Sequence, residues 1–295
     1  MTGRSGHADG HALKGIGLVM LAVIIFSLSD VTGKYLFQTH AVPFVIAVRY
    51  GVNLLILAVF VGARHGTAVL RTQKTGLVLV RAGSLALASL AMGLALKRMP
   101  VGETVAIIYL SPFAVMLLAA WLLGEKPVLA SWVGALVGFS GVLLIVRPGA
   151  GLDPAGVGLA LLAAAATVAY HLLSRQLAQT ETTLSMLFYT ALVGTVVFGA
   201  MLPWGWDGRV PNLHDGVLLL ALGVFATVGH ALFTAAYREA PASLLAPVNY
   251  LALVWAALFG WIVFDHAPDW ITLIGMALIV IAGMAVALRQ HFHKT

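Results

Sequence analysis

The sequence predicts an all-α integral membrane protein with ten transmembrane helices. Hydrophobic residue types make up 61% of its 295 residues, whereas Asp, Glu, Lys and Arg together make up only 9%. Soluble domains carry about 25% charged residues, so a chain this apolar has too little polar surface to face water on every side. A soluble globular protein is therefore excluded, and lipid is the expected solvent.

Turn residues and charges divide the chain into ten apolar segments, each close to the roughly 20 residues that a helix needs to cross a bilayer. In chain order the predicted helices are 14–37, 43–62, 76–96, 102–123, 128–146, 155–174, 183–203, 214–236, 242–264 and 269–288. Helix-breaking residues mark many of the short connections: Pro43, Pro100, Gly124 with Pro127, Pro148 with Gly149, Pro203 through Pro211, Pro241 and Pro268. The first segment lacks a signal-peptide cleavage site and is interpreted as an uncleaved helix.

The two halves of the chain repeat one another. A shift of 141 residues without gaps superposes matched Gly, Pro and Tyr residues at helix starts and turns: Gly15 on Gly156, Gly17 on Gly158, Pro100 on Pro241, Tyr109 on Tyr250, Pro127 on Pro268 and Gly134 on Gly275. Since five helices are an odd number, the second copy enters the membrane from the opposite side. The sequence therefore predicts two inverted five-helix repeats, 14–146 and 155–288, able to rock about a site near the midplane.

The positive charges favour one orientation. Ten Lys and Arg residues fall on one side of the predicted membrane and five on the other, which places both termini in the cytoplasm. The net charge of +6 is then mainly a topology signal, so we expect no nucleic-acid partner. The chain has no cysteine, which excludes thiolate metal sites and cysteine nucleophiles. We expect no cofactor and no metal, with the bilayer and a small-molecule substrate as partners of a monomer or weak homodimer.

Charged residues inside a membrane helix are expensive and are therefore candidates for function. Asp30 and Arg49 lie at matching depth on the first two predicted helices, and Lys34 lies one turn from Asp30. The spacing predicts an ion pair toward the outer half, which either locks the hairpin, acts as a gate or presents a charge to the substrate. The shift of 141 carries Asp30 onto His171, which is either a satisfied buried histidine or a proton-sensitive group. Arg81, near the cytoplasmic end of the third helix, is expected to snorkel outward.

Uncharged polar residues supply further candidates for a cavity between the halves. His230 and Asn249 lie too deep to reach the interface easily, and Asn249 follows Pro247 just as Ser111 precedes Pro112. Proline inside a helix frees a backbone carbonyl, which suits a substrate site but also occurs for packing alone.

Two matched tyrosines complete the predicted substrate site. Tyr109 and Tyr250 occupy the same position in the two repeats, and a tyrosine ring can stack on a substrate and still offer a hydroxyl. Tyr170 and Tyr189 are weaker candidates, and helix packing explains any single tyrosine equally well. The repeated placement favours Tyr109 and Tyr250.

Glycines in the fifth and tenth helices predict close helix contact: Gly134, Gly138, Gly141, Gly275 and Gly283. The stretch 138–141 also spells the G-x-S-G of intramembrane serine proteases, with Ser140 as nucleophile and His230 as base. Four residues in a glycine-rich chain are weak support for an enzyme, and a protease needs no inverted repeat.

Several stretches resemble EamA-type members of the drug/metabolite transporter superfamily. They are 26–36 with Arg49-Tyr50, then Pro100 through Pro112, 122–125 and Gly134 with Gly141, echoed by Pro241 through Pro247, Phe264-Asp265, Gly275 and Gly283. The resemblance covers about residues 14–288. It implies a bacterial inner-membrane protein that exports or exchanges small metabolites through a central cavity, similar in size and topology to YddG-type amino-acid exporters. The pair Asp265-His266 departs from the first half's Gly124-Glu125, so the two corners need not act alike.

We therefore expect a secondary transporter that works by alternating access. The small number of intramembrane basic residues favours amino acids or similar zwitterionic, partly apolar solutes over phosphorylated ones. A carrier for nucleoside-like or quaternary-ammonium compounds, an intramembrane serine hydrolase and a purely structural subunit are the alternatives.

Overall fold

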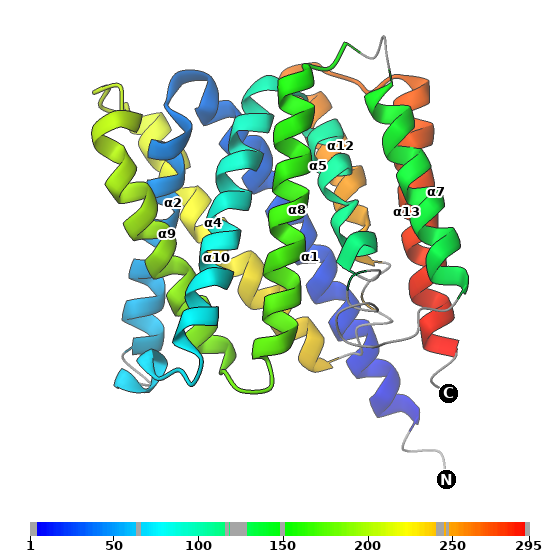
Figure 1. The fold of residues 1–295 in the computed structure, drawn as a ribbon, viewed down its shortest axis with the longest axis horizontal. Coiled ribbons are helices and arrows are strands. Elements are labelled where there is room, and N and C mark those ends of the chain that lie inside the picture. Colours follow the sequence, from blue (N-terminus) through cyan, green and yellow to red (C-terminus); the bar gives the residue numbers. More distant parts are fainter. Residues whose placement is uncertain are drawn as a thin grey trace. The chain divides into compact units, whose positions relative to one another are not determined.

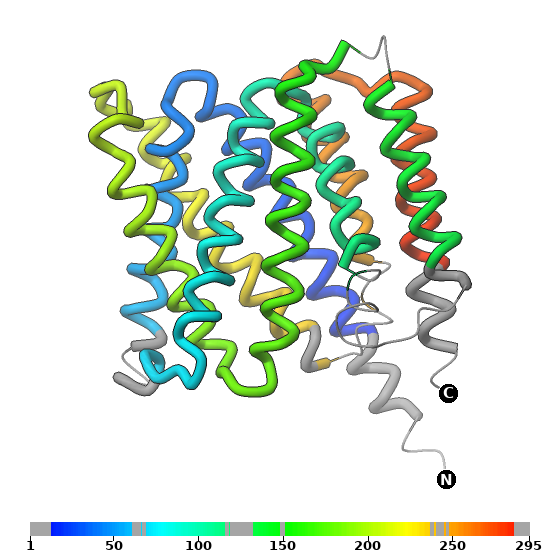
Figure 2. The backbone as a smooth tube through the Cα atoms, in the orientation of Figure 1, coloured from blue at the N-terminus to red at the C-terminus, as the bar shows by residue number. Residues whose placement is uncertain are grey.

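The computed structural model describes residues 5–62, 66–115, 118, 129–147, 151–239, 245 and 248–292 (Figure 1). Figure 2 shows the same backbone as a tube, coloured from the N-terminus to the C-terminus. Within these residues the chain forms ten α-helices, with one π-helical and one 3-10 segment between the second and third of them. Six of the helices are long and apolar enough to cross a membrane, and shorter apolar helices account for the other four. The expectation of an all-helical membrane protein is confirmed.

The helices follow the predicted order (Figure 1). They are α1 Ser5–Thr39, α2 Val42–Leu57, α4 Thr75–Arg98, α5 Val101–Ile108, α7 Leu129–Val146, α8 Pro154–Leu177, α9 Thr183–Gly205, α10 Leu213–Glu239, α12 Leu251–Phe264 and α13 Trp270–Phe292. The π-helix Ala58–Gly62 continues α2, and the 3-10 helix Gly66–Leu70 follows it.

Local chemistry explains several helix ends. Asp153 precedes Pro154 and accepts a hydrogen bond from the backbone N–H of Ala155, so α8 begins with an N-cap and a proline in its first turn. Thr182 caps α9 through the N–H of Ser185. At the end of α12, Asp265 adopts the left-handed conformation, with φ 53° and ψ 30°, which turns the chain out of the helix.

The fourth and ninth predicted helices differ most from the structure. α5 ends at Ile108 and the chain turns at Tyr109 and Leu110 before helical structure resumes at Ser111. α12 begins only at Leu251, directly after Tyr250. The glycine and proline positions of these regions named in the sequence, at 124, 127, 241 and 247, lie outside the described residues.

The chain divides into two compact units, each built from both halves of the sequence. The first unit comprises Met1–Val31, Pro100–Gly151 and Val228–Thr295, and the second comprises Thr32–Met99 and Leu152–Thr227. α1 and α10 each contribute one part to either unit. The compact units are therefore not the sequence repeats, because each repeat contributes helices to both.

In the first unit, α7 packs along α13 and α5 packs along α12 (Figure 1). The α7–α13 contact is close enough that a Cβ atom added to Gly141 would lie 2.6 Å from the Gly275 carbonyl oxygen, and one added to Gly275 would lie 2.6 Å from that of Gly141. Gly138 leaves room for the Phe113 ring. The predicted packing role of these glycines is confirmed.

In the second unit, α4 packs against α8 and α9, and α2 packs along α9. The Tyr50 ring lies against the bare backbone of Gly194 on α9 and stacks on Phe198, with ring centroids 5.6 Å apart. Its hydroxyl lies 2.9 Å from Ser89 Oγ on α4. Tyr50 thus joins α2 to both α9 and α4.

Two polar contacts of the second unit reproduce the 141-residue repeat. His40 Nε2, between α1 and α2, lies 2.9 Å from Asp215 Oδ2 in the first turn of α10. The same shift carries His40 onto Glu181 and Lys74 onto Asp215. Glu181, between α8 and α9, indeed binds the start of α4, since its carboxylate accepts hydrogen bonds from the backbone N–H of Lys74 (2.7 Å) and Gln73 (2.9 Å). Equivalent positions are therefore braced in both repeats by different chemistry.

Two ion pairs share one position of the repeat, with opposite charges there. Arg98 at the end of α4 pairs with Asp153 before α8 at 3.0 Å, in the second unit. Glu239 at the end of α10 pairs with Lys14 of α1 at 2.6 Å, in the first unit. The shift of 141 superposes Arg98 on Glu239. The end of α4 and the end of α10 are thus each held by an ion pair to another helix or its cap, with the base on α4 and the acid on α10.

Candidate functional site

The first unit contains two helix interruptions at equivalent positions of the repeats. Tyr109 ends α5 and Tyr250 precedes α12. At each tyrosine the backbone forms a hydrogen bond between residues three apart, as in a 3-10 helix. The bonds run from Leu110 N to Ile107 O and from Leu253 N to Tyr250 O, both at 3.1 Å. Non-helical backbone within membrane spans is tolerated where it is buried in protein or lines a cavity, and it is a frequent feature of transporter binding sites.

The two interruptions meet. The Tyr109 and Tyr250 rings have centroids 5.6 Å apart at an interplanar angle of 59°, and the Tyr109 hydroxyl donates to the Asn249 carbonyl oxygen at 3.1 Å. Tyr250 is buried against the bare backbone of Gly283 on α13, with Phe113 at 6.2 Å. The structure thus brings Tyr109, Tyr250 and Asn249 together, and it buries Ser111 where helical structure resumes after the turn.

Helices α1 and α10 add further groups in this unit. The buried Ser27 hydroxyl of α1 donates to the Ala252 carbonyl oxygen at 3.3 Å, next to the interruption before α12. The ring of His230 on α10 contacts Phe26 edge to face at 5.1 Å, and Gly229 provides the space for Phe26. His230 is half-buried, and the Phe26 ring covers part of its side chain.

The predicted charge cluster is divided between the units. Asp30 lies in the first unit, whereas Lys34 and Arg49 lie in the second, and the pairing of Asp30 with Arg49 stays a prediction. Lys34 has a further role, because its ammonium donates to the carbonyl oxygens of Leu96 (2.7 Å) and Met99 (2.6 Å). These carbonyls end α4, where a positive charge is favoured by the helix dipole.

The other predicted residues lie in the second unit. His171 is exposed on α8, with its ring 5.3 Å from that of Tyr170. Tyr189 donates to the Leu70 carbonyl oxygen at 3.0 Å and joins α9 to the preceding 3-10 helix. A part for Tyr189 in the cavity wall stays a prediction. A part for His171 in binding or proton transfer stays a prediction.

Arg81 does not snorkel, and this prediction is wrong. Its side chain is buried, with 4% of the residue exposed, and it points into the second unit between α4, α8 and α9. Its guanidinium donates to neutral oxygens of four residues: Ser174 Oγ (2.6 Å), Thr190 Oγ1 (2.9 Å), the Tyr170 hydroxyl (2.8 Å) and the Met186 carbonyl (3.2 Å). Hydroxyls on α8 and α9 accept hydrogen bonds from the guanidinium. The charge is therefore stabilised inside the unit, and the side chain does not extend to the membrane interface.

Sequence reasoning also missed Glu103. This carboxylate is buried in the first turn of α5, and its Oε1 lies 3.1 Å from His266 Nε2. The left-handed turn at Asp265 directs the chain so that His266 can reach it. An acidic residue three positions after Pro100, at the start of an apolar segment, was the available signal.

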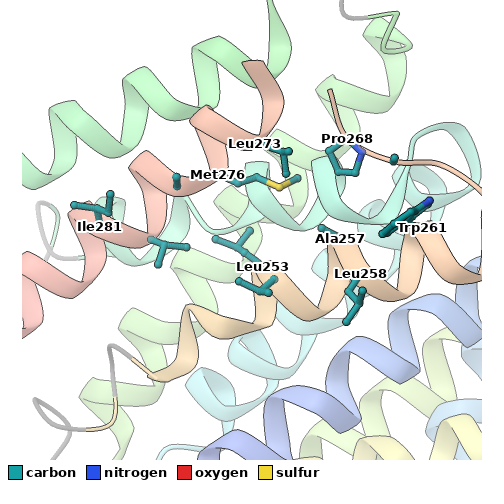
Figure 3. Close-up of a pocket in the computed structure, with 12 residues that line it drawn as sticks. Leu253, Ala257, Leu258, Trp261, Pro268, Leu273, Met276 and Ile281 are labelled. Atoms are coloured by element: carbon teal, nitrogen blue, oxygen red, sulfur yellow. The ribbon is translucent and has the colours of Figure 1, made fainter. Parts of the chain in front are cut away.

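The pocket between α12 and α13 is entirely apolar (Figure 3). It encloses about 530 Å³ and its walls include Leu253, Trp261, Met276 and Ile281. Substrate pockets for polar metabolites carry a few polar groups that fix orientation, and none of the residues lining this pocket provides one. Tyr109 and Asn249 are not part of its wall, so the pocket is distinct from the meeting of the two helix interruptions.

Comparison with known proteins identifies the family. Residues 13–147 and 154–288 each match the EamA-like transporter family. The chain belongs to this family. It carries two EamA domains and is a membrane transporter rather than an enzyme. Ser140 agrees with this, because it is exposed on α7 and its hydroxyl donates to the Leu136 carbonyl of its own helix.

The relatives of this EamA protein transport several kinds of small molecule. It is 31% identical to the pseudopaline exporter CntI of Pseudomonas aeruginosa, over 92% of this chain and 95% of the exporter. It is 28% identical to the S-adenosylmethionine uptake transporter of Rickettsia bellii, over 94% of each chain. It is 31% identical to the riboflavin transporter of Brucella anthropi, over 83% of this chain and 88% of that protein.

The fold is shared with a solved structure. A crystal structure superposes with a TM-score of 0.68 and 23% identity, over 97% of this chain and 99% of the other. The family match and the relatives, rather than this structure, make the EamA protein a secondary transporter of small metabolites and a multi-pass membrane protein with bacterial relatives. The narrower likeness to YddG-type amino-acid exporters is not supported by these relatives.

Proposed function

We propose that this EamA protein exports or exchanges amino acids or similar zwitterionic, partly apolar metabolites across a bacterial inner membrane by alternating access. Aromatic and other neutral amino acids are the expected substrates. The meeting of two equivalent helix interruptions at Tyr109 and Tyr250 carries the proposal. Such interruptions expose backbone polar groups inside the membrane, and there they bind solute in several transporter folds.

The chemistry at the interruptions suits a solute with an aromatic or apolar side chain. Two tyrosine rings offer stacking surfaces, and Asn249 and Ser111 add polar groups. His230 and Phe26 extend the aromatic surface along α10 and α1. In this proposal the substrate-binding residues are Tyr109, Tyr250, Asn249, His230, His171 and Ser111. Asp30, Lys34 and Arg49 act as a gate or charge pair, and Asp30 or His171 carries a proton if transport is coupled to one.

Transport by the purified protein in liposomes tests the proposal. We expect exchange of labelled tryptophan or phenylalanine, reduced roughly tenfold or more in Tyr250→Ala because an aromatic contact and its burial are lost. Tyr109→Phe keeps the ring and should retain most of the flux. Phe139→Ala, which removes an exposed ring from α7, is the matched control. Absence of any amino-acid flux, with or without a pH gradient, would exclude the proposed substrates.

The relatives favour a second candidate, a solute with a fused heteroaromatic ring. S-adenosylmethionine carries an adenine and riboflavin an isoalloxazine, and the same tyrosine pair could stack on either ring. Competition by both compounds, by a nucleoside and by a quaternary-ammonium compound against one labelled amino acid separates the candidates. Stronger competition by the fused-ring solutes than by amino acids would favour this second assignment.

A further inference from the structure

Arg81 is a buried cation held entirely by neutral groups. Among the residues that the structure describes, no carboxylate lies within ion-pair distance of its guanidinium, which instead donates to three hydroxyls and one carbonyl. A buried charge without a counter-charge is costly in a membrane span, and such residues usually serve function.

The surrounding hydroxyls are fixed as acceptors. Ser174 Oγ donates to the Tyr170 carbonyl oxygen at 2.6 Å, and Thr190 Oγ1 donates to the Met186 carbonyl oxygen at 2.7 Å. Each hydroxyl proton is therefore used within its own helix, which leaves the oxygen lone pairs facing Arg81. The guanidinium also lies over the Tyr170 ring, with Cζ 4.3 Å from the ring centroid. Arg81 is held in one position by α8 and α9.

The Nη2 group of Arg81 and the Tyr170 hydroxyl lie beside one another. Nη2 donates one N–H to the Tyr170 hydroxyl at 2.8 Å. In the described part of the chain, the second N–H of Nη2 meets no acceptor, and the Tyr170 hydroxyl beside it also lies within hydrogen-bond reach of the Ser174 hydroxyl. A guanidinium N–H next to a hydroxyl matches the two oxygens of a carboxylate, and a charge-assisted pair of this kind is strong.

We infer that Arg81 and Tyr170 form the binding site for the carboxylate of the transported solute. This inference rests on the proposed function, since it names the group through which a zwitterionic metabolite is recognised. A single guanidinium balances the single negative charge of a carboxylate, whereas a phosphate monoester carries about two charges at neutral pH. Because Arg81 is buried, the carboxylate reaches it only when the helices around it move apart during the transport cycle.

Paired solutes that differ only in the carboxylate test the site. Tryptophan and tryptamine form one pair, and S-adenosylmethionine and its decarboxylated form make the other. Affinity is measured by competition for uptake into liposomes and by ligand-induced thermal stabilisation of the purified protein. In Arg81→Gln we expect the carboxylate-bearing member of each bound pair to weaken roughly 10- to 100-fold, the range for a lost hydrogen bond to a charged group. The decarboxylated member should change less than about threefold.

Three further variants separate binding from folding. Arg81→Lys keeps the charge and should recover part of the carboxylate preference. Tyr170→Phe keeps ring and charge, and should weaken only the carboxylate-bearing solute by about two- to tenfold. It reports on the site even where Arg81→Gln does not fold. Ser84→Ala, on α4 with its hydroxyl bonded to the Val80 carbonyl of the same helix, is the matched control and should behave as wild type.

The outcomes distinguish this inference from the proposed substrate class. The carboxylate site is overturned if Arg81→Gln and Tyr170→Phe weaken the binding of both members of a solute pair equally. It is also overturned if either variant keeps the wild-type preference for the carboxylate-bearing member. The site is also overturned if the wild-type protein prefers neither carboxylate-bearing solute. If wild type binds S-adenosylmethionine with an Arg81-dependent preference but moves no amino acid, the site stands and the proposed amino-acid function fails.

Discussion

Gly141 on α7 and Gly275 on α13 approach one another so closely that a Cβ on either would lie 2.6 Å from the other's carbonyl oxygen. Real Cβ atoms do not come so near a backbone oxygen, so neither position has room for a side chain. Small residues allow two membrane helices to pack by close backbone contact, which replaces the hydrophobic driving force that lipid does not supply.

Gly141→Ala should therefore separate α7 from α13 and lower the free energy of unfolding by about 1 to 3 kcal/mol, the usual range for an overpacked contact. Gly158→Ala is the matched control. Gly158 lies inside α8, and a Cβ atom added there would have no neighbour within 4 Å. Alanine at this position should therefore stabilise the helix by about 0.4 to 1 kcal/mol. Thermal unfolding in detergent measures both, and equal stability of the two variants would contradict the close contact.

The brace at Glu181 makes a second prediction. Glu181→Ala leaves the backbone N–H groups of Gln73 and Lys74 without their acceptor at the start of α4. Loss of part-buried hydrogen bonds to a charged acceptor should lower stability by about 1 to 3 kcal/mol. Glu181→Gln retains one acceptor oxygen and should lose less. A Gln variant as unstable as the Ala variant would show that the charge, rather than the hydrogen bonds, is what matters.

The repeat made much of this fold predictable from sequence. The 141-residue shift was visible in matched Gly, Pro and Tyr residues, and it singled out Tyr109 and Tyr250, whose rings the structure then places 5.6 Å apart. The brace between His40 and Asp215 was hidden, because the shift turns His40 into Glu181 and Asp215 into Lys74, so neither chemistry nor residue type is preserved. At these two contacts the repeats share only the positions of the residues and not their types, so the relation can be recognised only after the contacts are known.

Arg81 shows the other limit of sequence reasoning. A lone arginine near the end of an apolar segment can snorkel or be buried, and the choice depends on what the neighbouring helices offer. Here the acceptors come from Ser174 on α8 and Thr190 on α9, which are unremarkable alone and lie about 100 residues further along the chain. Their convergence follows from helix packing, which residue spacing does not reveal.

Asp153 predicts a pH dependence at the surface of the second unit. The hydrogen bond from Arg98, and then the N–H of Ala155, lower the pKa of this carboxyl below its usual value of 3.8. Because the folded pKa is lower than the unfolded one, the interaction stabilises the protein fully above about pH 4 and is lost as the pH falls through the folded pKa.

Asp153→Asn should accordingly make the stability of the protein depend less on pH below about pH 4. The pH dependence near neutral pH should stay unchanged. The unfolding midpoint measured from pH 6 to pH 3 in detergent gives this comparison. Arg98→Gln removes the main cause of the lowered pKa and should weaken the same pH dependence. A pH dependence that is identical in wild type and both variants would show that other carboxyl groups dominate.

Orientation can be tested by labelling, because the chain contains no cysteine and each introduced cysteine is therefore unique. Asp207 lies in the exposed connection between α9 and α10, and Gln179 lies in the exposed turn between α8 and α9. The excess of Lys and Arg predicts that position 207 faces outward and position 179 the cytoplasm. In spheroplasts, a membrane-impermeant maleimide should label Asp207→Cys at once and Gln179→Cys only after permeabilisation. The reverse pattern would place both termini outside, and immediate labelling of both would contradict the passage of α9 across the membrane.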